Sequence, residues 1–343
     1  MYPLPYTSFL SVCKAGSPPN QHLQTDRPHR VLFVAGDTSQ CGYYRAYLPA
    51  LSLQRHSEKF HAVVTHHLSI DLIDWADIIV WQRLCDPKLF PFFARARRAA
   101  KISIYELDDN WHTIDDSNPA RAKADAAVFS LGGLEISNVY ETALLFMSAC
   151  DHVLVATETL ASFYRKYVAR PIHVINNSID LARGDLSHLR GSFPKIRIIW
   201  AGVSSHARDL AIVAPALRRL KQSLDGRIKI ILIGFDGVAT IKMPDGTSKL
   251  FDAAVPYDAC EAGVFLDEFH PYLARRTPDI GIAPLADIEF NDFKSPVKFH
   301  DYAYAGAPTI ASNSVVYRQV MSDGHNGLLV ENTTDAWHDA LLR

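Results

Sequence analysis

The chain has 343 residues, of which 48% are hydrophobic and 21% are charged, and 35 Lys and Arg against 37 Asp and Glu leave a net charge of −2. This length exceeds one ordinary core and predicts two domains. The balanced charge argues against a dedicated nucleic-acid binder, whose phosphate contacts need a basic excess. No apolar run approaches the roughly 20 residues that span a bilayer, which excludes a membrane-spanning protein. The composition also excludes a disordered chain and a small disulfide-stapled domain.

Short β-rich runs alternate with longer helical patterns along the chain, which is typical of α/β proteins with parallel sheets. Near-continuous Val, Ile and Leu runs suit strands that are buried on both faces. The first set of predicted strands is 30–35, 60–65, 77–82, 101–106, 152–156 and 172–175, with helices near 43–56, 87–100, 134–149 and 158–168. The second set is 196–201, 227–234, 264–266, 279–283, 308–311 and 327–330, with helices near 207–223, 270–276, 295–305, 315–322 and 334–342.

Two such sets predict two doubly wound, Rossmann-like domains. We place an irregular N-terminal extension at 1–28, the first domain at 29–183, a polar linker containing Gly and Pro at 184–195, and the second domain at 196–343. The chain stops inside a predicted helix, so we expect the second domain to be truncated and the chain to belong to a longer protein.

The cysteines predict a reducing compartment. Their number is odd, their spacing is wide, and no Cys-x-x-Cys occurs, which argues against a disulfide framework and a zinc site. The first 16 residues also lack the pattern of a signal peptide, so we expect a cytoplasmic protein. The five positions are Cys13, Cys41, Cys85, Cys150 and Cys260.

The first candidate site is the turn Gly36–Arg45, which joins the first strand to a helix. Gly42 lets a phosphate or sugar approach the backbone, and a helix N-terminus favours an anion. The spacing is not Gly-x-Gly-x-x-Gly, so no dinucleotide fingerprint is present. An ordinary turn between strand and helix is the alternative interpretation.

The second candidate is the segment Tyr105–His112, at the carboxyl end of a predicted strand. Adjacent acids, an aromatic residue and a histidine can orient sugar hydroxyls or perform acid–base chemistry. On extended backbone Asp108 and Asp109 would point apart, which favours separate hydrogen-bonding roles over a shared metal. A solvated acidic loop is the alternative.

The third candidate is a second glycine turn, at Gly202. Arg208, in the first turn of the following helix, can reach a phosphate held at that end, because a guanidinium matches phosphate geometry. The alternatives are a surface arginine paired with an acid and, for His206, a capping or packing role.

The fourth candidate is the segment from 290 to 308, which carries the strongest pattern in the chain. Ser295 suits the N-cap and Pro296 the first position of a helix ending before Gly306. The free N–H groups of that helix form an anion site, with Lys294 beside it. Asp301 lies where it can accept hydrogen bonds from a ribose diol. A well-capped helix without a ligand remains the alternative.

Together these residues resemble the GT-B-fold glycosyltransferases, and most closely the retaining family 4, over about residues 30–342. The most specific part is KSPVKFHDYAYAGAPTIASNSVVYRQVMSDGHNGLLV, which is similar to that family's donor-binding segment. The resemblance implies two Rossmann-like domains facing a central cleft and a nucleotide-diphosphate sugar as donor. It implies no cofactor and no metal.

The resemblance also implies roles for individual residues. Asp301 matches the second glutamate of the family's E-x7-E motif, which binds ribose, and Arg208 matches the lysine that binds the diphosphate. Gly42, followed by Arg45, matches the glycine loop of the first domain. His112, with Asp109 near it, lies where family members carry a histidine beside the donor sugar.

The sequence departs from the family pattern at two places. Phe293 stands where the first motif glutamate belongs, so the sequence lacks that contact to the sugar, and Asn291, Asp292 and Lys294 are the candidates to replace it. Val203 stands where the family has an arginine, and we expect Lys294 to supply the missing charge next to Ser295 and Pro296.

The predicted function is sugar transfer from the nucleotide-diphosphate donor to a glycan, lipid-linked or protein acceptor, as in polysaccharide biosynthesis, with retention of configuration. The predicted catalytic residues are His112, Asp109, Arg208 and Lys294. The donor ligands are Gly42, Arg45, Gly202, Arg208, Lys294, Ser295, Pro296 and Asp301. The alternatives are a non-catalytic sugar-nucleotide or glycan-binding module, a GT-B epimerase or phosphorylase, and a metal phosphoesterase built on the Asp108–Asp109 pair.

The segment 87–101 has five basic residues, several phenylalanines and no acid. It can touch an anionic lipid surface and so place the protein at the inner face of a membrane. A solvated helix with its phenylalanines in the core is the alternative.

Overall fold

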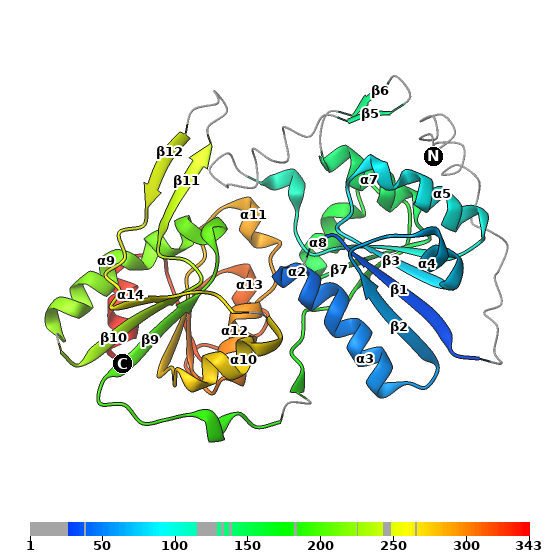
Figure 1. The fold of residues 1–343 in the computed structure, drawn as a ribbon. Coiled ribbons are helices and arrows are strands. Elements are labelled where there is room, and N and C mark those ends of the chain that lie inside the picture. Colours follow the sequence, from blue (N-terminus) through cyan, green and yellow to red (C-terminus); the bar gives the residue numbers. More distant parts are fainter. Residues whose placement is uncertain are drawn as a thin grey trace. The chain divides into compact units, whose positions relative to one another are not determined.

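The computed structural model describes residues 27–343, apart from Thr38, Asp225, Phe265 and the segments 115–128, 132–133, 137–138, 182–183 and 243–247. The chain divides into two compact units, shown in Figure 1. Unit 1 comprises Met1–Thr113 and Lys123–Asn177, and unit 2 comprises Ile114–Ala122 and Ser178–Arg343. Most of the predicted N-terminal extension and Cys13 lie outside the described residues.

Unit 1 is built on a six-stranded parallel sheet. The strand order is β2-β1-β3-β4-β7-β8. The central strands are apolar on both faces, and Leu32, Ile79 and Trp81 have no exposed surface. The strands are β1 (His29–Ala35), β2 (Phe60–Thr65), β3 (Ile78–Gln82), β4 (Ile102–Leu107), β7 (His152–Val155) and β8 (Ile172–Val174).

Helices connect these strands, as parallel pairing requires. Ser69 and Thr157 cap α4 and α8 through their side-chain oxygens, which accept hydrogen bonds from backbone N–H groups in the first turn. The helices are α2 (Gln40–Gly42), which continues through the π-helical turn Tyr43–Tyr47 into α3 (Leu48–His56), then α4 (Ile70–Trp75), α5 (Phe90–Arg98), α7 (Val139–Ala149) and α8 (Glu158–Tyr164). A short hairpin, β5 (Phe129–Leu131) and β6 (Leu134–Ile136), precedes α7.

Unit 2 has a second six-stranded parallel sheet, with the order β13-β10-β9-β14-β15-β16. Numbered within the unit, this is the Rossmann order 3-2-1-4-5-6. The strands are β9 (Ile196–Ala201), β10 (Ile228–Ile233), β13 (Ala259–Glu261), β14 (Ile280–Ala283), β15 (Thr309–Ser312) and β16 (Leu328–Val330).

The longest helix of unit 2, α9 (Ala207–Ser223), packs an apolar stripe on this sheet. Leu210, Val213, Leu217 and Leu220 recur at helical spacing and are fully buried. Trp200 and Trp337 fill the same core. The remaining helices are α10 (Leu266–Arg275), α11 (Glu289–Asp292), α12 (Val297–Tyr304), α13 (Val315–Arg318) and α14 (Thr334–Leu342).

Some predicted elements differ from the structure. The third strand of unit 2 is Ala259–Glu261, not 264–266, because it is a short edge strand whose half-exposed residues give no buried-strand pattern. A hairpin of β11 (Val238–Lys242) and β12 (Ser248–Asp252), which the sequence analysis missed, precedes it. Helix α4 was also missed, and part of the predicted helix 134–149 is strand β6.

The predicted linker packs on unit 2. Leu186 is buried in the core of this unit, and Tyr304 donates a hydrogen bond to the carbonyl of Gly184. The Arg190 guanidinium donates to the carbonyls of Ala305, Gly306 and Pro278. The boundary between the units therefore falls after Asn177, before the predicted end at residue 183.

Most of the charged side chains in the basic segment 87–101 have acidic or carbonyl partners. Arg95 pairs with Asp74 at 2.8 Å, the buried Arg97 pairs with Asp151 at 2.5 Å, and Lys101 donates to the carbonyl of Asp74. Phe90 and Phe93 have no exposed surface. These contacts are those of an amphipathic helix packed on its own sheet. Among the described helices, none combines the length and hydropathy needed to cross a membrane.

Close packing of β14 against α12 gives a stability prediction. A methyl group at Gly281 would lie 2.4 Å from the Tyr302 ring. Such overpacking costs about 1–3 kcal/mol, so we expect Gly281→Ala to lower the midpoint of thermal unfolding. Gly263→Ala is the control, because its methyl group meets only Gly234 Cα at 3.8 Å. Equal midpoints for the two variants would contradict the packing described here.

Candidate functional site

Each sheet contains one point at which the strand order reverses. In doubly wound sheets, ligands bind beside this point at the carboxyl ends of the strands. In unit 1 the point lies between β1 and β3, and in unit 2 between β9 and β14. These topologies place the candidate sites at the loops that follow those four strands.

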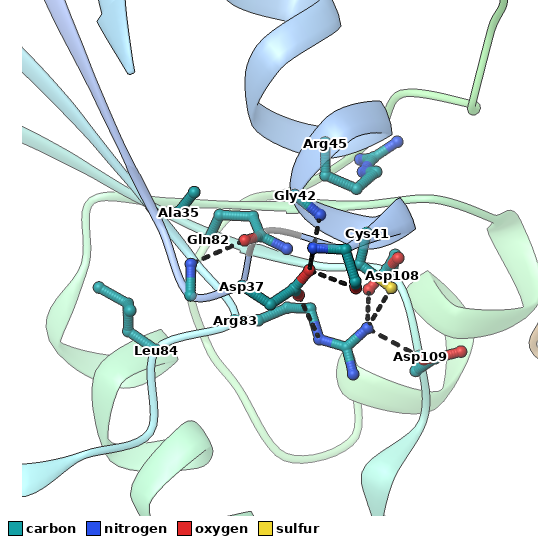
Figure 2. Close-up of polar contacts among 12 residues, drawn as sticks. Ala35, Asp37, Cys41, Gly42, Arg45, Gln82, Arg83, Leu84, Asp108 and Asp109 are labelled. Carbon is teal, nitrogen blue, oxygen red and sulfur yellow. Dashed lines mark hydrogen bonds and ion pairs between the residues drawn. The ribbon is translucent and has the colours of Figure 1, made fainter. Parts of the chain in front are cut away.

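The turn after β1 is held by its own aspartate. In Figure 2, Asp37 Oδ1 accepts hydrogen bonds from the backbone N–H of Gly42, at 3.1 Å, and from Ser39. Gly36 donates to both oxygens of Gln82, and a methyl group on Gly36 would lie 2.6 Å from its carbonyl. The N–H that the resemblance assigns to the donor diphosphate is therefore bonded to a carboxylate within the loop.

Arg83, at the end of β3, joins three loops of unit 1. Its Nη1 donates to Cys41 Sγ at 2.6 Å, to Asp108 Oδ1 at 3.0 Å and to Asp109 Oδ2 at 3.2 Å, and its Nε lies 4.0 Å from Asp37 (Figure 2). Arg83 has a φ of 54°, a left-handed conformation that is uncommon outside glycine. We call these five residues the Arg83 cluster. It sets three carboxylates against one guanidinium.

The expectation that Asp108 and Asp109 point apart is wrong. Both carboxylates bond to the same Arg83 nitrogen, because the chain leaves the extended conformation after Leu107, where β4 ends. Among the described residues, ligand atoms of Cys41, Asp108 and Asp109 lie within 4.8 Å of one another, as a metal site requires. The Arg83 guanidinium bonds to all three, and burial raises the pKa of the Cys41 thiol well above its usual value. The positive charge among these side chains thus comes from the protein itself.

Arg45 is a buried structural residue in unit 1. Its Nε lies 2.5 Å from Glu106 Oε1, and its Nη1 donates to Asn177 Oδ1 and to the carbonyl of Ile175. Both charged side chains are at most 3% exposed. Burial raises the pKa of Glu106 to about 7, which Arg45 opposes. The guanidinium predicted to bind donor phosphate is engaged with these internal partners.

His112 lies in an aromatic cluster near the carboxyl end of β4. Its Nδ1 is 3.2 Å from the hydroxyl of Tyr164, and burial lowers the pKa of the imidazole. The buried Nε2 has no hydrogen-bond partner among the described residues. Four aromatic rings lie around the imidazole, with centroids 5.4–6.2 Å from the imidazole centroid: Tyr140, Phe163, Tyr164 and Tyr167. The predicted catalytic pair Asp109 and His112 thus lies near one edge of unit 1, but with different partners.

In unit 2, the partly buried Lys298 lies beside Gly202 at the end of β9. Lys298 Nζ donates to the carbonyl of Ala201 at 2.5 Å and lies 5.2 Å from the Trp200 ring centroid. A methyl group on Gly202 would be 2.6 Å from that ring and 3.1 Å from Nζ. Burial lowers the pKa of Lys298 to about 8. Glycine at 202 thus leaves room for an ammonium group at this strand end.

Asp209, in the first turn of α9, holds the loops on both sides of the reversal point of unit 2. Its Oδ1 accepts hydrogen bonds from the backbone N–H of Ala286, at 2.8 Å, and from Asn291, at 3.0 Å. Its Oδ2 bonds to His206 Nδ1 at 2.7 Å and lies 4.0 Å from Lys294 Nζ. Although burial raises the pKa, these partners lower it to about 2, so the carboxylate is ionised at neutral pH.

The predicted helix 295–305 is shorter in the structure. Pro296, with a ψ of 40°, is the N-cap of α12, and the helix begins at Val297. The buried Ser295 Oγ has no hydrogen-bond partner among the described residues. Gly306 has a φ of 76° and follows the helix end as predicted. Ser295 and Pro296 therefore lie one position outside their predicted places.

The two remaining predicted donor ligands are differently exposed. Arg208 is an exposed side chain in the first turn of α9, next to Asp209. Asp301 lies in α12 with its side chain 10% exposed, and its Oδ1 is 2.8 Å from Nε2 of the buried His270. Its predicted bond to ribose stays a prediction.

The structure is similar to solved glycosyltransferases over almost its whole length. HepE of Anabaena in complex with UDP and glucose has 12% identity and a TM-score of 0.54, over 91% of this chain and 88% of that one. An α-glucosyltransferase in complex with UDP-glucose and DNA has 9% identity and a TM-score of 0.55, over 92% and 89%. A Rickettsia africae glycosyltransferase has 11% identity and a TM-score of 0.54, over 92% and 87%.

Two six-stranded parallel sheets, each with flanking helices, match the two Rossmann-like domains of these neighbours. The fold is GT-B. The predicted fold class is therefore confirmed. No protein-family model matches the chain, and no curated protein matches it in sequence. Membership of family 4 stays a prediction.

The GT-B chain contains three site residues to which the sequence analysis gave no site role: Arg83, Asp209 and Lys298. Lys298 was within the recognised segment KSPVKFHD, three residues before Asp301 and so on the same side of the helix. Asp209 follows the predicted Arg208 directly. Arg83 follows a predicted strand, where parallel sheets concentrate functional residues. The sequence position of each residue indicated that it lies near the site. Its hydrogen-bond and ion-pair partners could be identified only in the structure.

The buried pair of Arg45 and Glu106 gives a test of the role of Arg45. Removing one partner of such a pair costs about 3–5 kcal/mol, because it leaves an uncompensated buried charge. We expect Arg45→Met to lose stability in denaturant unfolding, and the double variant Arg45→Met/Glu106→Leu to regain much of it. A stable Arg45→Met with weakened nucleotide binding would instead support its predicted role as a donor ligand.

Proposed function

We propose that this GT-B chain is a glycosyltransferase that takes its sugar from a nucleotide-diphosphate donor bound by unit 2. The observation that carries the proposal is the set of basic side chains at the reversal point of that unit. Lys294 and Lys298 lie near Asp209 and the end of β9, and Arg208 is exposed on the adjacent first turn of α9. The structural neighbours that were solved with UDP or UDP-glucose support a nucleotide sugar as the donor.

The chemistry of these residues suits a departing diphosphate. Breaking the bond between sugar and phosphate leaves negative charge on the diphosphate, and preorganised positive groups lower the barrier where charge develops. Lys294 lies 4.0 Å from Asp209, and the negative charges of Asp301 and Asp209 also act on Lys298. Because the pKa of Lys298 is about 8, most of this amine is charged at pH 7. The lysines would thus bind the donor and stabilise the leaving group.

The charge of unit 1 points to a different role. The Arg83 cluster has three carboxylates and one guanidinium, an arrangement that disfavours a second phosphate-binding region there. Carboxylates accept hydrogen bonds from sugar hydroxyls, so we assign the acceptor to unit 1. Whether it is a glycan, a lipid-linked sugar or a protein is left open by this chemistry.

The proposal includes catalysis without a metal, because the lysines supply charge in unit 2 and Arg83 supplies it between Cys41, Asp108 and Asp109. Retention of configuration, family 4 membership and a cytoplasmic location rest on the resemblance and the cysteine pattern. The basic segment 87–101 pairs largely with its own unit, which disfavours the predicted contact with the inner face of a membrane.

A second candidate is a sugar-nucleotide-binding module without transferase activity. Phe293, which replaces the first glutamate of the family motif, is 7% exposed in the core. Asn291 donates its amide hydrogens to Asp209 and to the carbonyl of Ala286. Neither residue offers a carboxylate to a sugar, so Asp292, which is exposed, is the predicted replacement that carries one.

Nucleotide release separates these two functions. UDP-, GDP- and ADP-sugars are incubated with the protein, with and without acceptor sugars and with chelator present. We expect release of one nucleoside diphosphate that increases with acceptor and persists in chelator. Binding without release would support the module, loss of activity in chelator would contradict metal-free catalysis, and binding of no donor would contradict both functions.

The two lysines give a prediction for affinity. Hydrogen bonds to charged groups contribute about 1.5–3 kcal/mol, so Lys294→Ala and Lys298→Ala should each weaken donor binding about 10- to 100-fold in calorimetry. The exposed Lys195→Ala is the control, and its affinity should equal that of the wild type. Deprotonation of Lys298 removes its charge, so the wild-type affinity should decrease as the pH rises above about 8. An unchanged affinity in both lysine variants would contradict the phosphate site.

A further inference from the structure

His206 has no part in the site predicted from sequence, yet it borders the lysines of unit 2. It ends a 3-10 turn (Ser204–His206) directly before α9. The Trp200 ring packs edge-on against it, with centroids 6.4 Å apart. The imidazole is thus held between β9 and the first turn of α9, where the donor phosphates are proposed to bind.

The hydrogen bond to Asp209 fixes the tautomer of His206. Asp209 is ionised and can only accept, so Nδ1 carries the hydrogen of the 2.7 Å bond. Nε2 has no hydrogen-bond partner among the described residues, and 18% of the side chain is exposed. In the neutral ring this Nε2 bears a lone pair, which repels a phosphate oxygen.

The charges around His206 keep the unliganded ring neutral. Burial and the positive charges of Lys294 and Lys298 lower its pKa to about 4, although Asp209 opposes them. A bound diphosphate adds two negative charges beside the lysines and reverses the balance in favour of the imidazolium. The second proton then converts Nε2 from an acceptor into a donor.

We infer that His206 is a phosphate ligand that takes up one proton from solvent when the donor binds, an inference that rests on the proposed function. Nε2 gains the proton and donates its N–H to a phosphate oxygen, Nδ1 keeps its bond to Asp209, and no covalent bond changes. Asp209 then has two functions: it holds the loops of the site and stabilises the imidazolium. Below the pKa of Lys298, donor affinity and pH are thereby linked through His206.

Calorimetry in two buffers of different ionisation enthalpy measures this proton. The probe is the sugar nucleotide that binds in the panel above, since its diester phosphates do not titrate near neutral pH. At pH 6.5, below the pKa of Lys298, we expect the wild type to take up close to one proton. Its dissociation constant should rise by up to about tenfold per pH unit between pH 5 and the pKa of the bound state, because uptake of one proton sets that slope.

Two variants complete the test. His206→Gln should take up no proton, bind about tenfold more weakly at pH 6.5 and lose the pH dependence. His188→Gln, at an exposed histidine of the same unit outside the donor-binding segment, should behave as the wild type. If His206 has only a structural role, His206→Gln will bind the donor more weakly, but the wild type will take up no proton on binding. That result would overturn the inference.

The remaining outcomes are also decisive. If His206→Gln fails to fold, the wild-type calorimetry alone decides, because zero uptake contradicts the inference. Binding with zero uptake leaves the proposed function intact. Absence of binding by every nucleotide sugar contradicts both proposals.

Discussion

The buried, ionised carboxylate of Asp209 is the constraint on which the candidate site of unit 2 depends. A charge removed from water must be compensated locally, and Asp209 recruits a backbone N–H, an amide, an imidazole and a lysine from separate segments of the chain. Arg83 has the corresponding position in unit 1, with the opposite sign. At the reversal point of unit 2, Lys294 and Lys298 lie near Asp209, whereas in unit 1 three carboxylates lie around the guanidinium of Arg83. This contrast in charge is the reason why we propose that unit 2 binds the donor and unit 1 the acceptor.

Most of the fold could be predicted from periodicity. The buried strands β1, β3, β9 and β10 consist mainly of apolar residues, and α9 has a clear helical stripe. The elements that were predicted wrongly lack such a pattern of buried residues. Strand β13 is short and half-exposed, so its pairing to β10 comes from the sheet and leaves no mark on its residues. The segment 184–190 has the polar composition of a linker, and its contacts with unit 2, through Leu186, Arg190 and the carbonyl of Gly184, depend on residues distant in sequence.

The sequence predicted which loops form the candidate site, but not which side chains contact one another there. Glycines and helix caps marked the right loops, because backbone geometry demands particular residues there. The partners of charged side chains were beyond reach, since they join residues as distant as Arg45 and Asn177, or Asp209 and Asn291. Gly42 shows the limit clearly: its position matched a phosphate loop, but an aspartate five residues earlier takes the N–H.

The hairpin of β11 and β12 has a structural consequence of its own. Consecutive parallel strands usually need a helix between them, but the connection from β10 to β13 contains this antiparallel pair, which packs on α9 through Ala239 and Ala253. Strands β11 and β12 pair with each other and with no strand of the two six-stranded sheets. Because lengthening a loop adds little closure entropy, this connection can gain or lose residues over evolution without moving the strands that carry the site.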